Sequence, residues 1–152
     1  MFIQEEELKS AIYQYQVIQI TEADNDITLM AIGAAEEEMR SYLEANNQVR
    51  FRDGRPLLDL NAILTAVGTE RNALLLTHCK TIAVWHLVQL CNADVIYEQT
   101  KERYDRAIAW LEKLGEGAVN ISTLPTLDPE AENNPNNTAP WSQGSRKKFR
   151  YE

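Results

Sequence analysis

The stretch from Leu74 to Leu90 constrains the fold most, because apolar residues cover nearly the whole circumference of the helix it predicts. A helix with one apolar stripe can lie at a surface, whereas a helix that is apolar almost all round needs neighbours on every side. We expect this helix to run from about Thr69 to Cys91, with Thr69 as its N-cap after Gly68. The sequence therefore predicts a central helix surrounded by others.

Three further segments have the spacing of amphipathic helices. They run from about Gln4 to Tyr13, from Asn25 to Ala45 and from Asp94 to Leu114. Each has apolar residues at three- and four-residue steps. Asn46-Asn47 and Gly115 are the predicted ends of the second and third segments. The expected fold class is all-α, a compact bundle of about four helices.

The segment between the second and the central helix departs from this pattern. Val49 to Leu57 alternates in polarity and contains Asp53-Gly54, the signal of a tight hairpin turn. Pro56 weakens the second strand because it has no amide proton to donate. We expect a small hairpin or an ordered loop here, and Leu60 to Val67 has room for a helical turn.

A change in composition after Gly117 divides the chain in two. Residues 118–152 contain four of the five prolines among many asparagines and few apolar residues. Such a segment cannot bury enough surface to offset the entropy lost when it orders. We expect a helical domain over residues 1–117 and a flexible C-terminal arm, extended or disordered, over residues 118–152.

The charge pattern argues against several classes of protein. The net charge is −8, and residues 1–117, with 19 acidic and 11 basic residues, account for all of it. An acidic body disfavours duplex DNA as a partner, so no specific nucleic acid is expected. The acidic start, Glu5 to Glu7, is unlike a signal peptide, and no apolar run approaches the ~20 residues needed to cross a membrane. Two cysteines do not make a disulfide-stapled scaffold, so we expect a reducing cytoplasm.

Few residues suggest catalysis or a cofactor. His78 and Cys79 are adjacent and diverge around a helix, and His86 lies two turns beyond His78. Cys79 and Cys91 are on the same predicted helix and too far apart to bridge. We expect packing roles for these residues, a solvated face for Glu36 to Glu38, no cofactor, no metal and no enzyme activity.

Two basic features suggest interaction surfaces instead. Arg50, Arg52 and Arg55 surround the predicted hairpin turn and would make a positive finger in an acidic body. We interpret this finger either as a soluble hairpin tip or as a contact with an acidic patch on another copy of the chain. The second feature is the end of the arm, where aromatic residues are interspersed with basic ones: Trp141, Arg146, Lys147, Lys148, Phe149 and Arg150. It is either a ragged terminus or a docking segment that orders on a partner.

Several stretches resemble a known family. They are Met1–Leu8, Arg71–Leu76, Ile82–Leu87 and Glu102–Glu112, together with a basic ending at Gly144–Lys147. In these the chain resembles the small virion proteins of Mu-like phages and prophages, which are similar to the head–tail connector, adaptor or neck proteins of long-tailed phages. The segment from Glu44 to Gly68 departs from that family's pattern.

The resemblance implies an all-helical adaptor that assembles as a ring between portal and tail, without catalysis. Its implied partners are copies of itself, the portal and tail-completion proteins, with no membrane involved. It would occur in the virion and, during assembly, in the host cytoplasm. Two alternatives remain at this point. One is a bacterial regulatory or binding module whose basic tail reaches nucleic acid, and the other is an enzyme using His78, Cys79 or His86.

Overall fold

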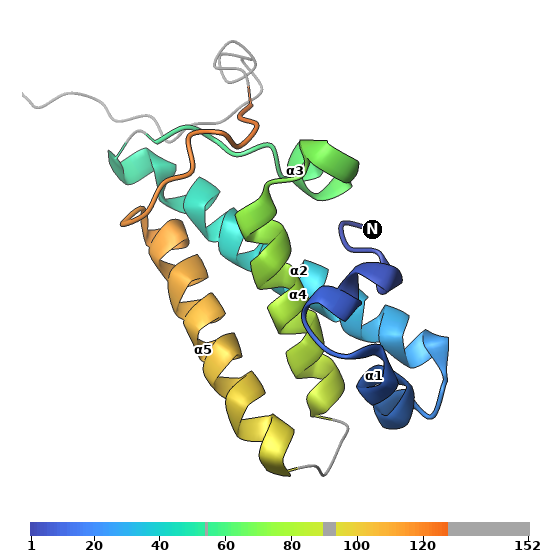
Figure 1. The fold of residues 1–152 in the computed structure, drawn as a ribbon. Coiled ribbons are helices and arrows are strands. Elements are labelled where there is room, and N and C mark those ends of the chain that lie inside the picture. The colour runs from blue at the N-terminus through green and yellow to red at the C-terminus, as the bar shows by residue number, and fades with distance from the viewer. Residues whose placement is uncertain (54, 90–93, 128–152) are drawn as a thin grey trace, which may run out of the picture.

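Three long helices form the centre of the molecule in the computed structural model, which describes residues 1–53, 55–89 and 94–127. They are α2 (Asn25–Asp53), α4 (Ala73–Val88) and α5 (Asp94–Glu116), and each packs against the other two (Figure 1). The described residues contain no β-strand, only an isolated bridge. The predicted all-α fold class is therefore confirmed. None of the helices in these three ranges is long and apolar enough to cross a bilayer.

Helix α4 is the central helix that its sequence predicts. Half of its sixteen residues are buried, and Leu75, Ile82 and Leu87 are completely inaccessible. The helix begins at Ala73, because the side chain of Asn72 accepts hydrogen bonds from the amides of Leu74 and Leu75. The prediction that Thr69 caps this helix is wrong, because Thr69 lies in a short 3-10 helix that precedes Asn72.

The N-terminal segment differs from the single helix expected over Gln4–Tyr13. A 3-10 helix, η1 (Glu5–Ser10), is followed by a second short helix, α1 (Gln14–Thr21), and both pack against α2 and α4 (Figure 1). Phe2 and Ile3, which precede η1, are completely buried. These two apolar residues anchor the N-terminal segment in the core. They lie outside the amphipathic stripe from which the helix was predicted, so that stripe does not reveal them.

Helix α2 continues for eight residues beyond its predicted end at Ala45, so residues 49–53 are helical and the predicted hairpin is absent. Asn47 does not break the helix, because its side chain binds the returning chain. Its Nδ2 donates to the carbonyl of Leu58 (3.0 Å), and its Oδ1 accepts from the amide of Leu58 (2.8 Å). The expected helical turn in Leu60–Val67 is confirmed as α3 (Leu60–Thr65), which a second 3-10 helix, η2 (Gly68–Glu70), follows.

Gly115 lies inside α5 and does not end it as predicted. A Cβ atom at this position would lie 3.2 Å from the carbonyl oxygen of Tyr42 and 3.3 Å from the Cβ of Ala45. The glycine therefore permits close packing of α5 on α2. The chain leaves the helix at Gly117, whose φ of +81° lies in the left-handed region that favours glycine.

The described beginning of the C-terminal arm, residues 118–127, returns across the end of the bundle. Leu124 is buried, and Leu58 and Thr126 form an antiparallel bridge. The amide of Asp59 donates to the carbonyl of Pro125, and the amide of Leu127 donates to the carbonyl of Leu57, both at 2.9 Å. The arm thus begins as an irregular segment, with a turn before Leu124, that packs on the helical domain. The rest of the arm lies outside the described residues.

Candidate functional site

Arg55 does not form an exposed finger in this structure. Its guanidinium donates to the carbonyls of Gly115 and Glu116, both at 2.8 Å, and to Oδ1 of Asn46 at 3.1 Å. These carbonyls end α5, where a cation complements the negative end of the helix dipole. Arg55 therefore joins the end of α5 to Asn46 in the C-terminal half of α2 within one chain.

The other predicted interaction residues lie wholly or partly outside the described part of the structure. Arg50 and Arg52 belong to α2, so the strand alternation that would align them is absent, and their side chains lie outside the described part of the structure. The same is true of the whole basic and aromatic segment: Trp141, Arg146, Lys147, Lys148, Phe149 and Arg150. Their role at an interface stays a prediction.

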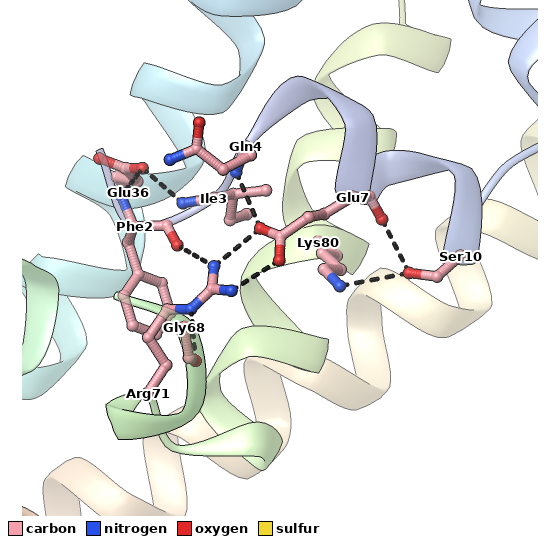
Figure 2. Close-up of polar contacts among 9 residues, drawn as sticks. All are labelled: Phe2, Ile3, Gln4, Glu7, Ser10, Glu36, Gly68, Arg71 and Lys80. Carbon is pink, nitrogen blue, oxygen red and sulfur yellow. Dashed lines mark hydrogen bonds and ion pairs between the residues drawn. The ribbon is translucent and has the colours of Figure 1, made fainter. Parts of the chain in front are cut away.

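An arginine clasp holds the N-terminal segment against the bundle (Figure 2). Arg71, between η2 and α4, donates to both carboxylate oxygens of Glu7 (2.6 and 2.7 Å) and to the carbonyl of Phe2 (2.8 Å). Its Nε donates to the carbonyl of Gly68 (3.2 Å). The hydrogen bond from Arg71 is the main reason why the pKa of Glu7 falls to about 2. A bidentate pair of this kind fixes the position of both partners.

The acidic run Glu36–Glu38 on α2 was expected to be a solvated face, and this prediction is wrong for two of its three residues. Glu36 accepts hydrogen bonds from the amides of Phe2 and Ile3 (Figure 2). Glu37 remains exposed, and its carboxylate lies 3.7 Å from Arg40. Glu38 contacts the other two long helices through its carboxylate. Two of the three carboxylates therefore organise the fold.

Glu38 joins all three long helices. One carboxylate oxygen lies 2.9 Å from Nε2 of His86 on α4, and the other accepts a hydrogen bond from the hydroxyl of Tyr104 on α5 at 2.6 Å. Burial and the bond to Glu38 raise the pKa of Tyr104. The Tyr104 ring stacks on Trp85, with centroids 5.2 Å apart. A carboxylate shared between helices in this way fixes how they pack.

The remaining candidate catalytic residues are packed into the bundle. Cys79 is completely buried, and burial raises the pKa of its thiol, which disfavours the reactive thiolate. It is seven residues from His86, about 10 Å along the helix axis, so the two do not form a nucleophile–base pair. His78 stacks on Trp110 at 4.6 Å, and burial lowers the pKa of its imidazole. Among the described residues, no group of three or more His, Cys, Asp or Glu side chains could hold a metal ion.

The four stretches that resemble Mu-like virion proteins come together as two contacts. Met1–Leu8 meets Arg71–Leu76 through the arginine clasp. Ile82–Leu87 meets Glu102–Glu112, because Trp85 stacks on Tyr104. A protein-family comparison matches residues 2–139 to the family described as Bacteriophage Mu, Gp36. The chain belongs to this family. No curated protein and no solved structure matches it.

Membership of the Gp36 family confirms the resemblance to proteins of Mu-like phages. The matched range contains every described residue except Met1, so it includes both contacts between the four stretches. It ends at residue 139, and the basic and aromatic segment from Trp141 to Arg150 lies beyond it. The family indicates a phage structural or assembly protein, which is a coarser statement than a head–tail connector.

Sequence reasoning missed the arginine clasp and the Glu38 contacts. Both join residues more than thirty positions apart, and helical periodicity carries no information about such pairs. A signal was nevertheless present, because Arg71 is the only lysine or arginine between Arg55 and Lys80 and lies two residues before the first residue of the central helix. An isolated arginine at that position has no local carboxylate at helical spacing on α4, and its partner must come from elsewhere.

Proposed function

We propose that this chain is a head–tail connector of a phage or prophage, which assembles as a ring between portal and tail and acts without catalysis. Its partners would be copies of itself, the portal and tail-completion proteins. It would reside in the virion and, during assembly, in the host cytoplasm. The family match over residues 2–139 carries this proposal.

The use of the polar side chains supports an assembly role. Arg55, Arg71 and Glu38 are engaged in joining segments of the chain, and Cys79 is buried. A ring subunit needs a body that keeps its shape while its two sides contact different neighbours. A bundle fixed at both ends and through its centre by such contacts meets that need.

Binding to portal particles tests the proposal. The purified chain is mixed with portal particles of the phage or prophage that encodes it, and the complexes are examined by electron microscopy. We expect a ring of density on the tail-facing side, in a constant ratio to portal. Repeated failure to bind either portal or tail-completion proteins would contradict the connector role.

A chain lacking residues 141–152 serves as the matched variant for the docking segment. If this segment orders on a partner, the shortened chain binds portal or tail-completion proteins more weakly. A gel shift of nucleic acid that weakens with salt and disappears in the same variant would instead favour the nucleic-acid-binding alternative.

A further inference from the structure

A basic groove interrupts the acidic surface of the molecule. It encloses about 710 Å³ between the η1–α1 connection, α4 and α5. Lys9, Lys80 and Arg103 line it, and its lining contains no carboxylate. Lys80 donates to the hydroxyl of Ser10, and neither Lys9 nor Arg103 forms an ion pair within the described residues. In a chain with a net charge of −8, this groove therefore concentrates positive charge, and within the described residues Lys9 and Arg103 have no ion-pair partner.

The rim of the groove carries exposed aromatic surface. Tyr13 lines the groove and is 70% exposed. Its ring stacks on that of Tyr15, which is also exposed, with centroids 5.8 Å apart. A cationic groove beside exposed tyrosines is suited to an acidic protein segment that also carries apolar side chains.

The chain itself presents such a segment at the corner between α1 and α2. Glu22, Asp24 and Asp26 are all exposed there, and residues 10–39 contain no lysine or arginine. The corner turns sharply, because Glu22 has a positive φ of 53°. Met30, one turn into α2, is 74% exposed. Figure 1 shows this corner on the opposite side of the view from α5, which forms one wall of the groove.

We infer that the basic groove binds the acidic α1–α2 corner of a second copy of this chain. The two surfaces have opposite charge, and each has exposed apolar side chains beside it, Tyr13 and Met30, that contact would remove from water. Because groove and corner are different parts of the molecule, the contact is heterologous and can continue from copy to copy until a ring closes. The inference deepens the proposed function and rests on it, since a ring requires a contact of this type.

Charge reversal in the groove is the first part of the test. The variant combines Lys9→Glu with Arg103→Glu, two exposed residues without ion pairs in the described structure, so the fold should be retained. Its matched control combines Lys101→Glu with Lys113→Glu, which changes the net charge equally at exposed positions outside the groove. We expect self-association to weaken at least about tenfold in the groove variant and to change much less in the control.

Charge reversal at the corner is the second part. The variant combines Glu22→Lys with Asp26→Lys and retains Asp24, whose carboxylate accepts a hydrogen bond from the amide of residue 26. Its matched control combines Glu44→Lys with Glu112→Lys, both exposed. Sedimentation velocity over a range of protein and salt concentrations measures association, and circular dichroism verifies that each variant is folded. We expect the corner variant, like the groove variant, to associate at least about tenfold more weakly than the wild type.

Mixing the two variants decides the pairing. A reversed groove attracts a reversed corner, and the unchanged surfaces still match, so an equimolar mixture should restore association with alternating copies. Three outcomes would overturn the inference: a wild type that stays monomeric at every concentration, variants that associate like the wild type, or a mixture that does not recover association.

Portal binding is measured separately. A chain that binds portal but never self-associates would contradict this contact and leave the connector role standing. A chain that self-associates through this contact but does not bind portal would contradict the connector role and leave the contact standing.

Discussion

At the N-terminal segment, Arg71 donates to both oxygens of Glu7 and to the carbonyl of Phe2, with only 10% of its side chain exposed. Its removal would leave the Phe2 carbonyl and Oε1 of Glu7 without the Arg71 donor in a partly buried position. We therefore expect Arg71→Ala to lower the free energy of unfolding by about 2–3 kcal/mol. Chemical denaturation monitored by circular dichroism measures the change.

A second arginine provides the control for this prediction. Arg106 pairs with Glu102 on the surface of α5, where its side chain is 74% exposed. Exposed pairs of this kind contribute little, so Arg106→Ala should cost no more than about 0.5 kcal/mol. The Arg71→Lys variant should lose much of the stability that the Arg71 contacts contribute, because an ammonium group cannot form the bidentate contact with Glu7. Equal effects of Arg71→Ala and Arg106→Ala would show that the clasp contributes no special stability.

The clasp also predicts a dependence of stability on pH. The pKa of Glu7 is about 2 in the folded chain, against an ordinary value of 4.5. A carboxyl with a lowered pKa in the folded state stabilises the fold at pH values above its unfolded pKa. This contribution should be complete at neutral pH and decline as the pH falls from about 4.5 towards 2. In denaturation experiments the Glu7→Gln variant should lose less stability over this range than the wild type does, and parallel curves would contradict the assignment.

At the scale of elements, replacing two glycines by alanine should change the stability of the fold in opposite directions. In Gly117→Ala the left-handed backbone is strained, and the new Cβ would overlap the guanidinium of Arg55, so the cap on α5 must move. We expect this variant to be less stable by at least about 1–2 kcal/mol. Gly33 lies inside α2, and no atom lies within 4 Å of the position that a Cβ would take, so Gly33→Ala should add roughly 0.5–1 kcal/mol. Thermal unfolding compares both with the wild type, and a Gly117→Ala variant as stable as the wild type would contradict the account of this cap.

At the scale of the whole molecule, the helical domain is completed by residues 118–127. Two shortened chains, one ending after Gly117 and one after Leu127, both lack residues 128–152. The difference between their stabilities therefore reports on residues 118–127 alone. The shorter chain loses the burial of Leu124 and the bridge between Leu58 and Thr126. We expect its unfolding temperature to be lower by roughly 5–10 °C, measured by calorimetry. Equal unfolding temperatures would place the end of the stable domain at Gly117 instead.

Much of the fold could be predicted from the sequence because its strongest signals are local. The apolar circumference of Leu74–Leu90 identified the central helix, and apolar stripes identified α2 and α5. Helix ends were predicted less well. Asn47 resembles a helix breaker in the sequence but binds Leu58, and Gly115 resembles a helix stop but permits close packing on α2. In both cases the partner is distant in the chain, and a residue's own preferences do not reveal it.

The sequence by itself determined that this chain is a helical bundle with a central apolar helix, because burial on one face or on all faces imposes a period that can be read along the chain. Only the tertiary structure decided the use of its charged side chains. Arg55 caps α5, Arg71 holds the N-terminal segment, and Glu38 joins three helices. Charge has no such period, and whether a charged side chain is used inside the molecule or remains available to a partner depends on which distant segment folding brings beside it.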